Sequence, residues 1–278
     1  MRLPPRLTQA FVVSLLGLAT AVTLVILIFV IVFILRKGLP AIDAEFLFTK
    51  PQDMGRAGGI LPTIVASVLL PLIAVAIAAP LGVSTAVYLT EYTRESRVTR
   101  MIRFGADCLA GIPSILFGLF GFIFFVTILH MGWSLLSGGL TLALMILPTI
   151  IRTTEEAIRA VPNSYREVSY SLGATRFRTT AKVVLPNALP GIVTGIMLGV
   201  GRSIGETAAV IFTAGSSLRM PTSIFDSSRT MSVHFYILAR EGLSSEKAYG
   251  TAAVLILSVL AVNLVAYGLM NRFIRKRS

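Results

Sequence analysis

Residues 7–35 read LTQAFVVSLLGLATAVTLVILIFVIVFIL, a run of 29 residues without a charged side chain. A helix needs about 20 consecutive apolar residues to cross the hydrocarbon core of a bilayer, which is ~30 Å thick. Of the 278 residues, 55% are hydrophobic and only 14% are charged, against about 25% in an ordinary soluble domain. This composition excludes a soluble enzyme, a disordered tail and a fibrous protein, and it predicts an all-α polytopic membrane protein.

Further uncharged runs cover 57–90, 108–151, 183–201 and 248–271. The run 108–151 is 44 residues long, enough for two spans, and the stretches 130–133 (HMGW) and 137–139 (SGG) mark a break between them. The fourth span is short and is expected to begin or end inside the protein. We predict a single domain, 1–278, with six transmembrane helices near 9–35, 62–90, 108–130, 138–152, 188–214 and 249–271.

The first run begins as a signal peptide would, with Arg2 and Arg6 followed by the small-residue stretch Ala19-Thr20-Ala21. The apolar region of a secretory signal is about 7–15 residues long. Here the run continues 14 residues past Ala21, so we expect an uncleaved membrane anchor.

The basic residues are distributed unevenly between the predicted loops. With both termini inside, 16 Lys and Arg side chains fall on inner segments and 8 on outer segments. Lys and Arg collect on the cytoplasmic side of membrane proteins, so the bias predicts an N-in, C-in topology, against which only Arg36 and Lys37 stand out. The net charge of +12 is therefore explained by topology and requires no nucleic acid. The charges of 91–103 and Asp107 are expected to be solvated or to lie at subunit contacts.

The chain lacks the residues for chemistry of its own. None of the five lysines is followed by Ser or Thr, so there is no P-loop, and two histidines with one cysteine form no metal-ligand pattern. Residues 201–205 (GRSIG) fit the G-x-S-x-G pattern of hydrolases, but they lie in an apolar helix and are interpreted as small residues at a helix contact. We expect a non-enzyme with no cofactor on this chain.

The predicted cytoplasmic segment 153–187 has a helix–glycine–helix pattern. Ser164 and Glu167 have capping-box spacing for a first helix, which Gly173 ends. Thr175 can begin a second short helix, which Pro186 ends. Such a hairpin suits a groove on a partner protein or, alternatively, the surface of anionic lipid. Its apolar residues include Val168, Leu172, Phe177 and Val184.

This segment resembles the E-A-A-x3-G-x9-I-x-L-P loop in the membrane subunits of ABC importers. The spacing matches throughout, although Val168 and Ser169 replace the two alanines and Val183 replaces isoleucine. The resemblance implies that the hairpin docks into a cleft of separate ATPase subunits, which would bind ATP and Mg. The matching positions are Glu167, Gly173, Val183, Leu185 and Pro186.

Two charges, Arg202 and Glu206, lie inside the predicted fifth helix. A charge at the bilayer centre costs about 2.5–3.5 kcal/mol on insertion scales, so both residues are functional candidates. Four residues apart, they are neighbours on one helix face and form either a structural ion pair or an anion site in which Arg202 lines a path. Arg152, near the inner end of the fourth span, is a second path candidate or a topological anchor. Small residues predicted to pack this helix closely are Gly191, Gly195, Gly199, Gly201 and Gly205.

Residues 201–208 (GRSIGETA) closely resemble the G-R-x-I-G-E-T signature of the membrane subunits of the phosphate-specific (Pst) importer, and the A-type subunit is the more similar. The resemblance, dense over 58–214, implies a permease for inorganic phosphate in the bacterial inner membrane. It would form a heterodimer with a homologous membrane subunit, above two ATPase subunits and below an external phosphate-binding protein that docks on the loops 36–61 and 215–248. The alternatives are a permease of the same fold for sulfate or molybdate, a passive anion channel, and a sensor that moves nothing.

Overall fold

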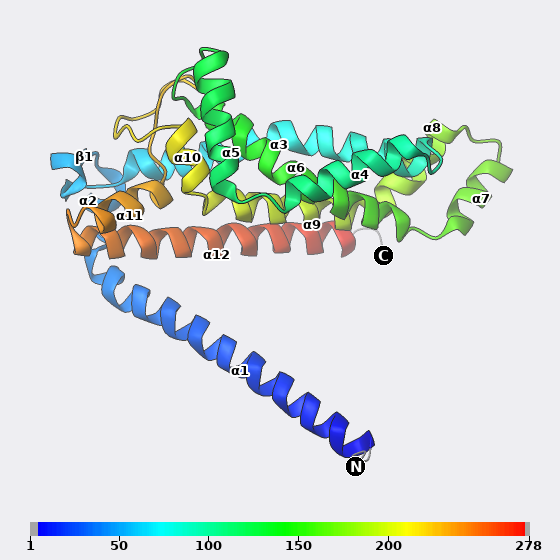
Figure 1. Cartoon of the computed structure of the whole chain (residues 1–278), viewed down its shortest axis with the longest axis horizontal. Coiled ribbons are helices and arrows are strands. Elements are labelled where there is room, and N and C mark those ends of the chain that lie inside the picture. The colour runs from blue at the N-terminus through cyan, green and yellow to red at the C-terminus, as the bar shows by residue number, and fades with distance from the viewer. Residues whose placement is uncertain (1–4, 276–278) are drawn as a thin grey trace.

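The computed structural model describes the backbone of residues 5–275, which is almost entirely helical (Figure 1). The one sheet in this range pairs two short antiparallel strands, β1 (Pro51–Gln52) and β2 (Ala57–Gly58). Five helices are long and apolar enough to cross a membrane, or six if one bent pair is counted as a span. The all-α membrane class is therefore confirmed, and five or six candidate spans lie among the described residues, against the six predicted.

The core is built around α6 (Leu135–Arg159), which packs between α3 (Leu61–Val87) and α9 (Leu185–Ile204). Leu142, Met145, Ile146 and Ile150 on α6 are all fully buried. The expectation of a short fourth span is wrong, because this helix has 25 residues. It continues past the apolar run as an amphipathic helix, with one face still turned towards the protein.

The third predicted span, 108–130, is divided by a sharp bend. An amphipathic helix, α4 (Arg97–Ala110), precedes α5 (Ser114–Gly121) and the π-helix Phe122–Ile128, and the two parts meet at 102°. Pro113 stands at the bend, and a residue before proline is biased away from helical geometry. As a result α5 turns away from the bundle, as Figure 1 shows.

The fifth predicted span, 188–214, differs from the structure at both ends. α9 ends at Ile204, and a separate short helix, α10 (Ala208–Thr213), follows the break. In the other direction, α8 (Arg176–Thr179) runs through the π-helix Thr180–Val184 into α9 without interruption. Pro186 therefore does not end a helix. It lies where the π-helix passes into α9, and the helix continues through it.

The two ends of the bundle carry different small elements. One end holds β1, β2, α2 (Ala44–Phe48) and α11 (Met231–Arg240), and the other holds α7 (Asn163–Ser171) and α8 (Figure 1). Following the charge-based topology, we name these the outer end and the inner end. The 3-10 helices Leu39–Ala41 and Asp53–Gly55 belong to the outer end, and the π-helix Tyr88–Tyr92 extends α3 at the inner end.

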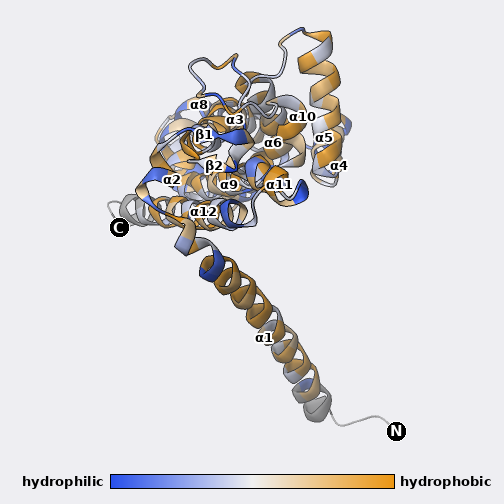
Figure 2. Ribbon diagram, turned by 90° about the vertical axis from the view of Figure 1, so that its left-hand side faces the viewer, coloured by the Kyte–Doolittle hydropathy of each residue, from blue (hydrophilic) through white to orange (hydrophobic). Residues whose placement is uncertain are grey.

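The first span, α1 (Pro5–Gly38), diverges from the bundle along most of its length (Figures 1 and 2). Only its C-terminal end packs closely, where Gly38 lies against Tyr249 and Ala253 of α12 (Ser245–Arg275). None of its most apolar 18-residue window is buried. The helix is apolar on all sides, which suits contact with lipid or with another membrane chain.

Candidate functional site

The hairpin at the inner end forms largely as the sequence indicates. Gly173, with φ +77°, occupies the left-handed conformation that ends α7, and the Thr175 hydroxyl caps α8 by accepting a hydrogen bond from the Arg178 amide at 3.3 Å. The predicted capping box is wrong, because α7 begins at Asn163, after Pro162, with no side-chain cap. Proline stands in the capping position and fixes the entry of the chain into the helix.

The tip of this hairpin exposes three large apolar side chains. Val168 is 61% exposed, Leu172 83% and Phe177 73%. We name these three residues the tip patch. Val184, predicted as part of the same apolar set, is instead fully buried and packs with Ile158. Apolar residues that would be costly to leave in water are thus exposed on the hairpin at the inner end.

The five positions of the ABC-type loop divide between surface and core. Glu167 and Gly173 are exposed on the hairpin, whereas Val183, Leu185 and Pro186 are half-buried where the hairpin joins α9. Leu185 packs against the cluster that contains Val184. The first part of the loop is therefore available to a partner, and the second part anchors it to the bundle.

A buried ion pair ties α7 to the inner end of α3. The Arg166 guanidinium donates to the Glu91 carboxylate at 2.7 Å, and their side chains are 15% and 6% exposed. Arg166 also donates to the carbonyl oxygens of Val161 and Ile158, at 2.8 and 3.0 Å. The expectation that the charges of 91–103 are solvated is wrong for Glu91. No local pattern reveals this pair, because its members are 75 residues apart.

A second network joins α4 to α6. Arg103 donates to Glu155 at 3.1 Å, and Arg159 approaches the same carboxylate at 3.6 Å. Arg152, a predicted path residue, lies nearby but on the surface, where it pairs with Asp107 at 3.3 Å and with Glu156 at 3.8 Å. The guanidinium of Arg152 is therefore compensated by carboxylates and faces water.

Arg202 and Glu206 do not lie on one helix face, because α9 ends between them. No ion pair joins them in the described part of the chain. The Glu206 carboxylate instead accepts a hydrogen bond from the Ala209 amide at 3.2 Å, at the start of α10. The Arg202 side chain is exposed and has no hydrogen bond or ion pair to any residue between 5 and 275.

The glycines of α9 fall into two groups. A Cβ at Gly191 or Gly195 would clash with Ala157 or Thr153 of α6, so these glycines permit the close approach of the two helices. Gly199 faces Ile146 at an ordinary contact distance of 3.5 Å. Gly201 and Gly205 meet nothing within 4 Å in the described structure, so the predicted packing applies only to the inner part of the row.

Ser203, at the centre of the G-x-S-x-G pattern, is 2% exposed and donates to the Gly199 carbonyl at 2.9 Å. This hydrogen bond lies within the helix and leaves no nucleophile facing a cavity. Among the described residues no group of three or more His, Cys, Asp or Glu side chains could hold a metal ion.

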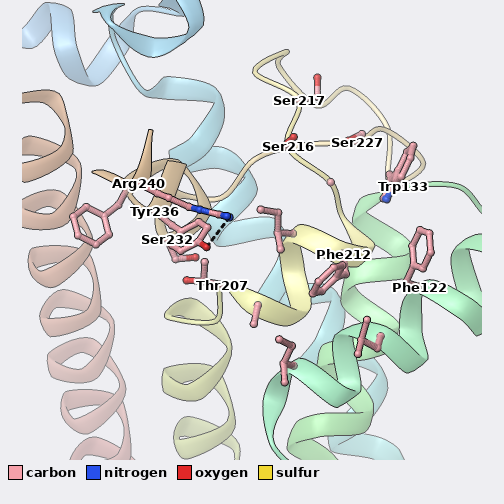
Figure 3. A pocket seen from close by; sticks show the side chains of 16 residues that line it. Phe122, Trp133, Thr207, Phe212, Ser216, Ser217, Ser227, Ser232, Tyr236 and Arg240 are labelled. Carbon is pink, nitrogen blue, oxygen red and sulfur yellow. Dashed lines mark hydrogen bonds between the residues drawn. The ribbon is translucent and has the colours of Figure 1, made fainter. Parts of the chain in front are cut away.

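Beyond the break that follows α9, a cavity of about 970 Å³ opens at the outer end (Figure 3). The lining is mostly apolar and includes Phe122, Trp133 and Phe212, and the hydroxyl-bearing side chains among the lining residues are called the hydroxyl wall here. Arg240 of α11 adds a positive charge. One sequence feature indicates this polar group, namely the four-residue spacing of Tyr236 and Arg240 within the predicted loop 215–248. The hydroxyl-bearing residues are Thr207, Ser216, Ser217, Ser227, Ser232 and Tyr236.

A buried arginine and histidine lie behind this cavity. Arg229 is 4% exposed and His234 1%. The Arg229 guanidinium donates to Nδ1 of His234, with 3.3 Å between the nitrogens, and to the Ser216 carbonyl at 3.0 Å. Burial, with Arg229 alongside, lowers the pKa of His234 to about 4, so the imidazole is neutral at physiological pH.

Comparison with known proteins identifies the relatives of this chain. Residues 78–278 match the family described as binding-protein-dependent transport system inner membrane component. A probable ABC transporter permease protein of Bacillus subtilis (strain 168), YqgI, is 33% identical over 287 residues, covering 98% of both chains. The phosphate transport system permease protein PstA of Pasteurella multocida (strain Pm70) is 32% identical over 265 residues, covering 94% of both.

The fold is also similar to that of a solved structure. A bacterial ABC transporter involved in the import of the acidic polysaccharide alginate contains a chain that superposes with a TM-score of 0.71. The match covers 96% of this chain and 97% of that one, at 14% sequence identity. The two chains therefore have the same fold.

Proposed function

The chain belongs to the family of binding-protein-dependent transport system inner membrane components, and we propose that it is the membrane subunit of an ATP-driven importer of inorganic phosphate. As an ABC permease subunit it is not catalytic, and the ATPase resides on a separate chain. An ATPase and an external substrate-binding protein are partners that this membership implies.

The inner hairpin supplies the contact with the ATPase. The tip patch offers apolar side chains to a groove, and the loop spacing from Glu167 to Pro186 supports this role. Two ATPase subunits, each binding ATP and Mg, would dock beneath this chain and a homologous second membrane subunit. The buried Arg166–Glu91 pair fixes the hairpin to the bundle. A hairpin that only lay on lipid would not require this attachment.

The link from hairpin to path is a single helical rod. Residues Arg176–Ile204 form 29 continuous helical residues, about 40 Å at 1.5 Å per residue, with Phe177 of the tip patch near one end and Arg202 near the other. A displacement of the tip by the closing ATPases would therefore be transmitted along α9. This would switch the path between inward-facing and outward-facing states.

The observation that carries the substrate assignment is the unpaired, exposed guanidinium of Arg202, located at a break in a membrane span. An uncompensated charge in a membrane protein is retained for function, and the planar fork of arginine donates two parallel hydrogen bonds to a phosphate oxyanion. Phosphate is also the substrate that the name of the Pasteurella multocida relative gives. The name of the Bacillus subtilis relative gives no substrate, so transport itself must be measured.

The test is ATP-dependent accumulation of phosphate in vesicles containing the assembled complex, with wild type and Arg202→Ala compared after assembly of both is checked. We expect wild type to accumulate phosphate and the variant to assemble without doing so. Equal uptake by both would return Arg202 to a structural role. Uptake of sulfate or molybdate in place of phosphate would reassign the substrate, and flux without nucleotide would identify a passive channel.

A further inference from the structure

The outer cavity combines apolar and polar side chains. Its volume of about 970 Å³ is ample for an oxyanion with its hydration water. Its lining is mostly apolar and includes Trp133 and Phe212. Figure 3 shows Arg240, Tyr236, Ser232 and Thr207 grouped together, with Ser216, Ser217 and Ser227 on the loop above them.

Arg240 is free to bind an anion. It forms no ion pair with any carboxylate in the described part of the chain, and its polar neighbour there is the Tyr236 hydroxyl, to which Nη1 donates at 3.0 Å. The guanidinium also lies over the Tyr236 ring, 5.7 Å from its centre. Because the hydroxyl oxygen already accepts from Arg240, its own proton is left for another acceptor. One O–H and the remaining guanidinium N–H groups are thus offered together.

The hydroxyl wall adds further donors. The Ser217 hydroxyl accepts from the Arg219 amide at 3.3 Å, which leaves its proton available, and the Ser216 hydroxyl has no partner among residues 5–275. Behind this wall the buried Arg229, which forms no ion pair within that range, donates to the Ser216 carbonyl. A second positive charge thus lies behind the hydroxyl wall, and its hydrogen bond holds the backbone of Ser216 in place.

The cavity adjoins the break at which Arg202 stands. Thr207 lines it, and the Ser232 hydroxyl donates to the carbonyl oxygen of Glu206 at 2.8 Å. Figure 3 shows Thr207 directly above the end of α9. Arg202 stands in the last turn of α9, so it and the cavity lie on opposite sides of the same break in the span.

We propose that this cavity is a receiving site for a tetrahedral oxyanion, in which Arg240 and Tyr236 bind the anion on its way to Arg202. The choice of phosphate among such anions rests on the proposed function, whereas the site itself does not. Hydroxyl groups both donate and accept, which suits an anion that carries both oxygens and protons. A site with one exposed arginine and neutral donors would hold the anion weakly, which allows it to move on.

The site can be tested by protection of an introduced cysteine in the assembled complex. Ser216→Cys is made with the native Cys108 changed to Ser, since Ser216 has no side-chain hydrogen bond to lose. The rate of modification by the neutral reagent N-ethylmaleimide is measured on this chain in increasing phosphate, with chloride at equal ionic strength as reference. The native chain provides the matched control, because its single cysteine, Cys108, is exposed on α4 and away from the cavity.

We expect phosphate to slow modification of the cysteine at 216 and to leave Cys108 unaffected. Arg240→Gln should raise the half-protecting concentration at least about tenfold, and Tyr236→Phe several-fold, because charge-assisted hydrogen bonds are lost. Arg219→Gln, which changes an exposed arginine of the same loop outside the cavity, should leave it unchanged.

The outcomes separate the site from the function. If no tetrahedral oxyanion protects the cysteine, or if chloride protects equally, the receiving site is wrong, whether or not the complex accumulates phosphate. If sulfate or molybdate protects and phosphate does not, the site stands and the phosphate assignment falls. If Arg219→Gln weakens protection as much as Arg240→Gln does, the effect reflects general surface charge and the site is wrong.

Discussion

Three arginines that hold the inner end together are paired with carboxylates, whereas two arginines of the outer half are not. At the inner end Arg166, Arg103 and Arg152 each contact a carboxylate, at 2.7, 3.1 and 3.3 Å. In the outer half Arg202 and Arg240 contact none within the described chain. A compensated arginine stabilises structure, whereas an exposed arginine without a carboxylate partner remains available to an anionic ligand. In the proposed mechanism the paired arginines hold the inner end in place, and the two exposed, unpaired ones meet the substrate.

The same division runs along α9. Its inner glycines are pressed against α6, and its outer glycines face open space. A helix packed tightly along its inner part and more loosely at Gly201 and Gly205 would carry a displacement from the hairpin to the region around Arg202 in the proposed mechanism. The following predictions test this contrast.

The largest effect is expected from Glu91→Gln. Removing one partner of a buried ion pair costs about 3–5 kcal/mol, because the remaining charge is left uncompensated. The hairpin should lose its fixed position on α3, so the complex should bind its ATPase subunits weakly and hydrolyse ATP without uptake. Co-purification of the ATPase and the ratio of uptake to hydrolysis measure both effects.

Glu95→Gln is the matched control for that variant. The Glu95 side chain is 85% exposed and lies 3.7 Å from Arg103, a surface pair worth less than about 1 kcal/mol. If both variants behave alike, the Arg166–Glu91 pair has no special part in coupling, and the paired arginines of the inner end lose the role assigned to them here.

A smaller effect is expected when arginine is replaced by lysine, which keeps the charge and loses the planar fork. At Arg202 the loss of one of two hydrogen bonds to the anion should lower uptake about tenfold. At Arg152, exposed and paired with Asp107, the same change should alter uptake less than about twofold. Uptake rates in vesicles with equal amounts of complex provide the comparison. An equal loss at both positions would contradict the distinction between paired and unpaired arginines.

Alanine at two glycines of α9 tests the packing contrast. At Gly195 the new methyl group would clash with Thr153, which should destabilise the chain by about 1–3 kcal/mol. At Gly201 there is room, and the better helix propensity of alanine makes the change neutral within about 0.5 kcal/mol. The thermal unfolding midpoint of the complex reports both. A large loss at Gly201 would indicate that the second membrane subunit covers this face.

How far the sequence predicts this molecule depends on whether the signal is local. The run 7–35 is sufficient to predict α1, and the glycine at 173 and the threonine at 175 are sufficient to predict the turn of the hairpin. The break after Ile204 could not be predicted in this way, because the apolar pattern continues across it to Ala214. Gly205 alone looks like a packing residue.

Contacts between residues far apart in the sequence could not be predicted for another reason. Nothing in the sequence near Glu91 indicates that Arg166 lies beside it. A charged residue in a short predicted loop is expected to be solvated. The outer cavity could not be predicted for the same reason, because its lining comes from α5, α10 and α11. In addition, the segment after α10 shows no regular spacing of apolar residues. The family signature led to Arg202 but not to the hydroxyl wall beyond it.

The smallest predicted effect concerns pH at the outer end. The folded pKa of His234 is about 4, against about 6.5 when unfolded, so between these values the unfolded state binds more protons. Stability therefore falls as the pH is lowered through this window. From pH 7 to 5.5 the loss is about 1 kcal/mol, because the imidazole must remain uncharged beside Arg229 while the unfolded chain takes up a proton.

Hydrogen exchange of the peptide 231–240 at the two pH values measures this loss locally. His234→Asn should remove the pH dependence, because the amide oxygen can still accept from Arg229 and does not titrate. The exposed His130 gives the contrasting case, and its replacement should leave the dependence intact. If protection of α11 is instead unchanged between pH 7 and 5.5 in the native chain, His234 is not held neutral by its surroundings. The buried Arg229 would then need another compensating group, and its assigned role behind the hydroxyl wall would be wrong.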